Sequence, residues 1–192
     1  MDDSGLPWRA ERAMDFGCGV GRLVVPLAKR FTQVAGVDIA EGMLAEAKKN
    51  TVRRQINNAV FYNQIPELEY DLVHSLFVLQ HISRDRGMNI ITTLWSKVSK
   101  GGILAIQLPI YFSGKKSVLR LRRLRNVFPL LQIPYNVING NRWNKPGMQM
   151  NIYDINLIVC GLQESGVKDI RLYRRDSDDS FRGVYMLASK EL

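Results

Sequence analysis

Residues 13–22 read AMDFGCGVGR, and this stretch decides the fold class. Apolar residues surround Asp15, and three glycines then alternate over five positions. Beyond them, apolar residues recur at helical spacing from Val20 to Phe31. The order predicts a buried strand over 11–16, a glycine-rich turn and a helix. Because glycine lacks a Cβ, such a turn lets a ligand approach the backbone closely.

The rest of the chain continues to alternate strands with helices. Ser83 is expected to cap the third helix and Gly101-Gly102 to end it. The alternation predicts an α/β fold with a seven-stranded, mostly parallel sheet, helices on both faces and an antiparallel C-terminal hairpin. The expected strands span 33–38, 58–62, 70–76, 103–108, 167–174 and 181–190, and the expected helices lie around 43–50, 83–98 and 155–162.

Composition places the chain among ordinary globular proteins. Its 192 residues are 46% hydrophobic and 23% charged, which suits one domain over 1–192. No apolar run is long enough to cross a bilayer, and segment 1–12 lacks the pattern of a signal peptide. Two isolated cysteines, Cys18 and Cys160, indicate a reducing compartment rather than disulfides. We therefore expect a cytoplasmic protein without a metal site.

The net charge of +9 is concentrated in one segment. Six basic residues and no acidic residue lie over 115–125, and apolar residues fall on one helical face as far as Phe128. The pattern predicts a basic amphipathic helix over 115–128, within an insertion at about 109–150. Three interpretations stay open: a solvated helix packed on the domain, a lid that binds substrate, or a surface for a membrane or nucleic acid.

The glycine spacing distinguishes between classes of ligand. Dinucleotide enzymes use Gly-x-Gly-x-x-Gly, whereas the third residue after Gly19 is Arg22, and no Gly-Lys-Ser/Thr of a phosphate loop follows. A nicotinamide dehydrogenase is therefore disfavoured. Asp15 would repel a pyrophosphate but attract an ammonium, and Asp38 ends the next strand, where a carboxylate accepts ribose hydroxyls. This set suits a cationic nucleoside without phosphates, such as S-adenosylmethionine.

Four stretches in chain order carry a family resemblance. They are DFGCGVGR at 15–22, VDIAEGML at 37–44, YDLVHS at 70–75 running into VLQHI at 78–82, and KGG at 100–102. Together they resemble the class I S-adenosylmethionine-dependent methyltransferases, specifically the small-molecule branch. The resemblance covers 13–108 well and 151–190 more loosely. It implies a Rossmann-like fold, S-adenosylmethionine as methyl donor and S-adenosylhomocysteine as product.

The resemblance also implies which residues hold the methyl donor. The family usually supplies an acid to the adenine amine, and this chain carries two amides at that place. Asp15, Gly17 and Gly19 would line the methionine arm, Asp38 the ribose, Ile39 and Met43 the adenine face, Asn63 and Gln64 the adenine amine, and Leu76 and Phe77 the sulfonium, while Cys18 would contribute only its backbone.

Several of these residues have a purely structural alternative. Asp38 followed by Glu41 also fits a helix cap. Asp15 would then be a strand end that bonds the turn, and Met43 a core residue. Cys18 is not expected to act as a nucleophile, because only its backbone is needed there.

Methyl transfer depends mainly on aligning the nucleophile with the methyl group, and a hydroxyl acceptor also needs a base. His81 is the candidate base, since histidine titrates near neutrality; the alternative is that it only packs in a tight turn. His74, inside a strand, is expected to be a core histidine. Segment 75–78, SLFV, lacks the Asn/Asp-Pro-Pro-aromatic turn of amino-methylating nucleic-acid enzymes. We therefore expect a small-molecule acceptor, methylated at oxygen.

Only about a dozen residues precede Ala13, where members of the resembled family usually carry helices that close the pocket. An alternative function follows from this difference. The chain would be a catalytically incomplete S-adenosylmethionine-binding module or subunit that engages an acidic partner through the basic helix over 115–128.

Overall fold

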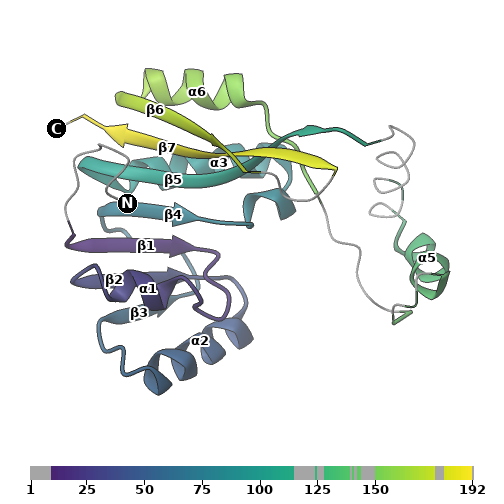
Figure 1. Ribbon diagram of the computed structural model, residues 1–192, viewed down its shortest axis with the longest axis horizontal. Helices are drawn as coiled ribbons and strands as arrows, with labels where there is room; N and C mark the ends of the chain where they lie inside the picture. The colour runs from purple at the N-terminus through teal and green to yellow at the C-terminus, as the bar shows by residue number, and fades with distance from the viewer. Residues whose placement is uncertain are drawn as a thin grey trace.

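The computed structural model describes residues 10–114, 124, 128–138, 140, 142, 143, 150–175 and 180–191. These residues form one sheet of seven strands in the order β3-β2-β1-β4-β5-β7-β6 (Figure 1). The strands are β1 (Arg12–Phe16), β2 (Gln33–Val37), β3 (Ala59–Tyr62), β4 (Tyr70–Ser75), β5 (Val98–Phe112), β6 (Val167–Arg174) and β7 (Phe181–Lys190).

In the described part of the chain, helices and short 3-10 turns connect the strands. The helices are α1 (Val24–Ala28), α2 (Glu41–Arg53), α3 (Arg84–Ser96), α5 (Gln132–Ile138) and α6 (Ile155–Glu164), and the 3-10 turns are η2 (Leu79–His81) and η3 (Pro129–Leu131).

The direction of the strands confirms the predicted fold class. β1 to β5 pair in parallel, whereas β7 runs antiparallel to both β5 and β6. The chain moves outward from β1 to β3 and then returns to the other side of β1 with β4. In open parallel sheets a ligand binds at the carboxyl ends of the strands where the order reverses. That place lies here between β1 and β4.

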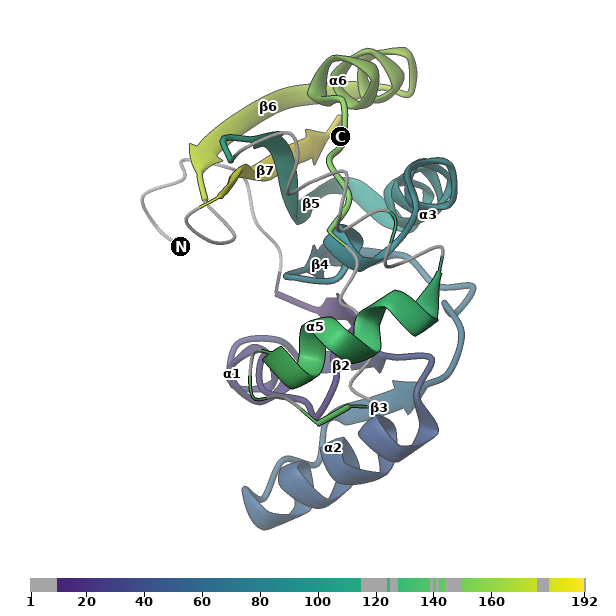
Figure 2. The ribbon, with the colours of Figure 1, turned by 90° about the vertical axis from the view of Figure 1, so that its right-hand side faces the viewer.

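Two apolar clusters pack on opposite faces of the sheet. α1 and α2 contribute to one cluster, with Val24 and Leu44 among the buried residues. α3 and α6 contribute to the other, through Leu94 and Ile158. Figure 2 shows α1 on one side of the sheet and α3 and α6 on the other, so the prediction of helices on both faces is confirmed.

The first helix begins later than the sequence pattern indicated. α1 starts at Val24 rather than Val20, because the glycine turn continues through Gly21, where φ is +79°. A left-handed backbone conformation cannot belong to a right-handed helix. The helix is therefore a short connection, and the segment 17–23 is free to shape a ligand site.

The glycine pair expected to end α3 lies instead inside β5. α3 already ends at Ser96, and β5 begins at Val98, which pairs with Tyr70 of β4. Gly101 has φ of +72°, and the pairing register shifts between Tyr70 and the next paired residue of β4. The glycines thus make an irregularity at the start of a strand. Ser83 stands at the N-cap position, but its side chain forms no capping bond.

The segment predicted as a basic insertion is described only in part. Apart from Leu124, residues 115–127 lie outside the described residues, and so does the basic helix predicted over 115–128. Within the described part, β5 continues to Phe112 and α5 follows. α5 stands beyond the carboxyl edge of the sheet (Figures 1 and 2). Among the residues that the structure describes, no helix has the length and apolar character needed to span a bilayer.

Candidate active site

A cavity of about 600 Å³ opens at the carboxyl edge of the sheet, at the place where the strand order reverses. Its walls come from the segments that follow β1, β2, β3 and β4, and from α3. This size suits a ligand as large as a nucleoside. The lining residues are Phe16, Gly17, Val37, Asp38, Ile39, Asn63, Gln64, Ile65, Phe77, Val78, His81, Ile82, Arg86 and Ile90.

The glycine turn is fixed by its own backbone. The carbonyl of Val37 accepts hydrogen bonds from the N–H groups of Gly17, at 2.7 Å, and Cys18, at 3.0 Å. A Cβ on Gly17 would lie 2.7 Å from Cγ1 of Val78 and closer still to Cγ2. Gly17 also has φ of +73°. Both the conformation and the close approach of the β4 loop therefore require glycine at this position.

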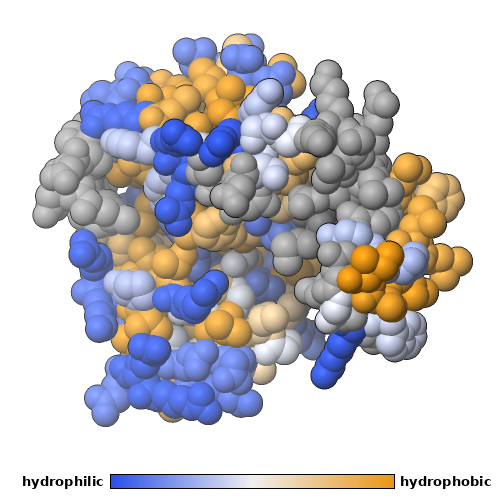
Figure 3. Space-filling view, turned by 45° about the vertical axis from the view of Figure 1, so that its right-hand side comes forward, coloured by the Kyte–Doolittle hydropathy of each residue, from blue (hydrophilic) through white to orange (hydrophobic). Residues whose placement is uncertain are grey.

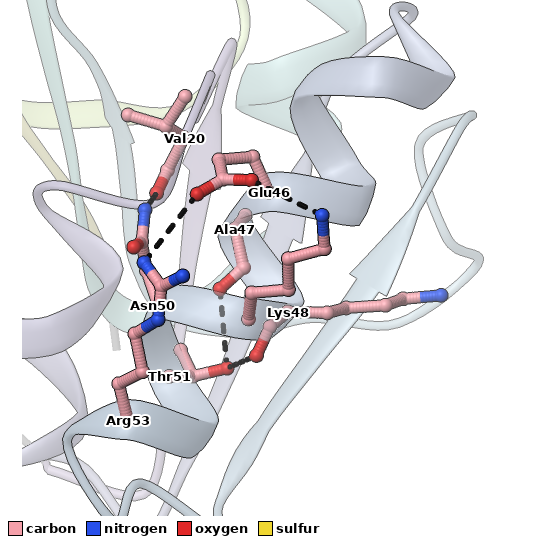
Figure 4. A network of polar contacts seen from close by, with 8 residues as sticks. Val20, Glu46, Ala47, Lys48, Asn50, Thr51 and Arg53 are labelled. Carbon is pink, nitrogen blue, oxygen red and sulfur yellow. Dashed lines mark hydrogen bonds and ion pairs between the residues drawn. The ribbon is translucent and has the colours of Figure 1, made fainter.

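The last residues of the glycine turn, Val20 and Gly21, contact α2. The side-chain amide of Asn50 donates a hydrogen bond to the carbonyl of Val20 at 3.0 Å, as Figure 4 shows. A Cβ on Gly21 would lie 3.2 Å from that of Ala47. On the outer face of the same helix, Glu46 pairs with the nearby bases Lys49 and Arg53. The turn is thus held between β2 and α2 without a ligand.

Asp38 connects the glycine turn with the loop that follows β2, and residues of both segments line the cavity. Its Oδ2 accepts from the N–H of Gly19 at 2.8 Å, and its Oδ1 accepts from that of Ala40 at 2.9 Å. Ala40, not Asp38, occupies the N-cap position of α2. The predicted capping alternative is therefore wrong in its position, although the carboxylate does bond the loop before the helix. Each carboxylate oxygen retains capacity to accept a further hydrogen bond.

Asp15 is buried beneath the glycine turn and does not line the cavity. Its Oδ1 lies 2.9 Å from Nδ1 of His74, whose side chain is also buried. The prediction that His74 is a core histidine is confirmed. The pair places a polar contact between β1 and β4 directly below the site. The predicted contact of Asp15 with the methionine arm stays a prediction.

Cys18 is a buried thiol at the centre of the turn. Burial raises its pKa to about 12, and the negative charges of Asp15 and Asp38 act in the same direction. The thiol therefore stays protonated near neutral pH and is a poor nucleophile. This agrees with the expectation that Cys18 contributes only its backbone.

The residues predicted to contact the adenine, together with Leu76, which was predicted to lie beside the sulfonium, divide into two groups. Ile39, Asn63 and Gln64 line the cavity, and Ile39 is 80% exposed although it is apolar. Met43 and Leu76 do not line it. Leu76 belongs to the segment after β4, and Met43 lies one turn into α2.

Phe77 has the backbone conformation of a strained site residue. Its φ is +60°, which is costly for a residue with a large side chain, and its side chain lines the cavity. The guanidinium of Arg175, which directly follows β6, lies 5.6 Å from the centre of the Phe77 ring. A cation over an aromatic face is a favourable contact. The contact connects the β4 loop to the far edge of the sheet.

His81 lines the cavity from the end of η2. Its Nε2 lies 3.1 Å from Nε2 of Gln80, and since an amide nitrogen only donates, the ring nitrogen accepts. A neutral ring in this arrangement carries its proton on Nδ1. To act as a base, His81 must therefore release Gln80 or exchange tautomers.

Tyr153 fixes the turn that carries His81. Its buried hydroxyl lies 2.9 Å from the carbonyls of both Leu79 and Ile82, and it can donate to one of them at a time. The ring packs against α3 so closely that a Cβ on Gly87 would lie 2.6 Å from Cε1. Burial raises the pKa of this tyrosine to about 12. Tyr153 is thus a buried packing residue that does not line the cavity.

Sequence reasoning missed the wall that α3 contributes. Ile82, Arg86 and Ile90 follow one another at intervals of four residues and all line the cavity. That interval places Arg86 and Ile90 on one face of α3, whereas Ile82 lies before the helix, at the end of η2. The spacing of Arg86 and Ile90 could therefore have indicated that the two residues share a face of the helix. Only the packing of α3 shows that this face lines the cavity.

Comparisons with known proteins agree on one class. Residues 14–104 match the family model described as a methyltransferase domain. A trans-aconitate 2-methyltransferase of Deinococcus radiodurans is 35% identical over 103 residues, 51% of this chain and 38% of that protein. A 23S rRNA (uracil(1939)-C(5))-methyltransferase of Vibrio parahaemolyticus is 40% identical over 65 residues, 34% of this chain and 15% of that protein. The chain thus spans well under half the length of these curated relatives.

Solved structures share the fold over nearly the whole chain. Magnesium protoporphyrin IX methyltransferase from Synechocystis, crystallised with bound SAH, matches with a TM-score of 0.68 at 23% identity and covers 99% of this chain and 78% of that one. A putative methyltransferase from Bacillus halodurans matches with a TM-score of 0.68 at 13% identity, over 100% of this chain and 97% of that one.

Proposed function

We propose that this chain is a class I, S-adenosylmethionine-dependent methyltransferase that transfers a methyl group from S-adenosylmethionine to an oxygen atom of a small molecule; the match of residues 14–104 to a methyltransferase domain supports this.

The residues at the cavity fit this methyl donor. Asp38 faces the cavity with a carboxylate that has capacity for two ribose hydroxyls. Ile39 presents an exposed apolar surface on which an adenine ring can lie, and the amides of Asn63 and Gln64 can bond to the ring's edge. A Cβ on Gly19 would meet nothing within 4 Å, so the backbone of the turn is open to a ligand. No lysine is present among the described residues that line the cavity.

The chain's own residues would mainly align the reactants. When bound, S-adenosylmethionine supplies a methyl group on a sulfonium, and an acceptor oxygen forms the new C–O bond while the electrons of the broken C–S bond stay on sulfur. Phe77, held at positive φ, would set the wall beside the reacting atoms. His81 would take the proton of a hydroxyl acceptor after it leaves Gln80. Alignment of this kind is the main source of rate acceleration in such a displacement.

The extent of the matches supports a small molecule as acceptor. The relative named for trans-aconitate aligns over half of this chain, whereas the one named for rRNA aligns over about a third. The segment after β4 also lacks the turn used to methylate amino groups of nucleic acids.

The observation that carries the proposal is a single one: Asp38 lines the cavity beside the glycine turn and bonds to the turn's backbone. Calorimetry with S-adenosylhomocysteine tests it, with Asp38→Asn as the variant. Loss of the charged acceptor should weaken binding about 10-fold or more. Asp85→Asn, an exposed acid outside the cavity, is the matched control and should bind as wild type does. Absence of binding to the wild-type chain would reject the proposal.

A further inference from the structure

One cationic side chain in the cavity wall, that of Arg86, has no role in the proposed binding of the methyl donor. Among the described lining residues, the titratable side chains are Asp38, His81 and Arg86, and only Arg86 carries a permanent positive charge. Asp38 lies after β2 and is already held by two backbone N–H groups. Arg86 lies on α3, a different wall. The cavity is therefore acidic where β2 ends and basic where α3 begins.

Arg86 has no partner within the described part of the chain. Every ion pair found there involves other cations, such as Lys49, Arg53 and Arg171. Its neighbour Asp85 lies in the same first turn of α3 but does not line the cavity. A cation in the first turn opposes the helix dipole, so the helix itself gains nothing from Arg86. The residue instead brings a fork of guanidinium donors to the cavity, which suits carboxylate and phosphate groups.

Apolar side chains flank this cation. Ile82 and Ile90 lie four residues to either side of Arg86, and Ile65 lines the cavity as well. Ile39 is also apolar, but it follows β2 on the other side of the cavity, where the proposed function assigns it to the adenine ring. The α3 wall thus combines one charged donor with an apolar surface. A ligand that matches it has an apolar body and one anionic group.

We infer that the acceptor is an amphiphilic anion whose carboxylate or phosphate is bound by Arg86, with its apolar body against Ile82 and Ile90. The inference rests on the proposed function, because it names the class of substrate for the same cavity. Arg86 is then a specificity-determining residue. The anion that it binds is distinct from the oxygen that is methylated, since holding a charge that disappears in the transition state would slow the transfer.

The test uses three probes of one shape, namely phenylacetate, benzylphosphonate and the neutral phenylacetamide. Binding to the full chain is measured by calorimetry, with and without saturating S-adenosylhomocysteine. We expect at least one anion to bind 10-fold or more tightly than the amide. The comparison of phenylacetate with benzylphosphonate then tells a carboxylate site from a phosphate site. Equal binding of the three probes, or no binding by any of them, overturns the inference.

Two arginines of the same helical turn provide the matched variants. Arg86→Gln should reduce the preference for the anion to less than 3-fold, whereas Arg84→Gln, outside the cavity, should leave it unchanged. A preference that survives Arg86→Gln, or that falls equally in both variants, overturns the assignment to Arg86. Failure of S-adenosylhomocysteine to bind would reject the proposed function separately, since the probes are also measured without it.

Discussion

The glycine turn and α5 both lie at the carboxyl edge of the sheet, but they are held there by different means (Figure 1). The turn bonds through its backbone to Val37 and through the side chain of Asn50 to α2. α5 instead leaves Val137 and Ile138 exposed, at 62% and 83%. Figure 3 shows the apolar side chains gathered at the right-hand edge of the molecule, where α5 lies.

The difference separates two tasks of the molecule. The site proposed for the methyl donor is built from strand ends and turns, which the packing of the sheet fixes before any ligand binds. The insertion that carries α5 leaves the sheet at β5 and returns to it through the segment before α6. Within its described residues, the side-chain amide of Asn136 donates a hydrogen bond to the carbonyl of Trp143 of the same insertion. Changes in the turn should therefore reach the whole fold, and changes in α5 should not.

The largest effect is expected at Gly17. Gly17→Ala forces a Cβ into Val78 at positive φ, and it should lower the free energy of unfolding by about 4 kcal/mol. Gly19→Ala has the same kind of φ but open space around it, and should lose about 1 kcal/mol. Urea denaturation measures both. Equal losses would show that the contact with Val78 is unimportant, and Val78→Ala in the Gly17→Ala background should restore part of the stability.

A smaller loss is expected when the layer beneath the turn is altered. His74→Leu leaves the buried carboxylate of Asp15 without its donor, which should lower the free energy of unfolding by about 3 kcal/mol. His74→Gln supplies a new amide donor and should lose distinctly less. If both variants lose the same amount, the packing of the ring and not its hydrogen bond stabilises this layer.

The smallest effect is expected in α5. Ile138→Ser should change the free energy of unfolding by no more than about 0.5 kcal/mol, because the side chain is already mostly in water. Leu94→Ala, on the buried face of α3, is the contrasting variant and should lose about 3 kcal/mol. A large loss at Ile138 would mean that α5 packs on the domain, and the comparison between the two regions would fail.

Local rules made much of the fold predictable. Three closely spaced glycines, the alternation of strands and helices, and four ordered motifs were enough to predict the sheet. The predicted fold class is confirmed, and residues 14–104 match the model of a methyltransferase domain. The errors have local causes as well. Apolar spacing cannot tell where a turn ends and a helix begins, so Val20 was assigned to α1. Gly101 was assigned to a helix end although it serves an irregular strand pairing.

The candidate site was predictable only where backbone geometry decides it. Asp38, Ile39, Asn63 and Gln64 directly follow strands, and their position at the cavity follows from that. Arg86 could not be found in the same way, because its place depends on the rotation of α3. That rotation is fixed by tertiary packing, in which Tyr153 contacts the helix.

The packing of Tyr153 on Gly87 has a consequence for how such sequences diverge. The ring occupies the space that any side chain at 87 would need, and its hydroxyl serves the turn that carries His81. A larger residue at 87 is therefore compatible only with a smaller one at 153. In an alignment of relatives these two columns should change together, although 65 residues of chain separate them (153 − 87 − 1). Such covariation would show that the region after the insertion and the turn that carries His81 have evolved together.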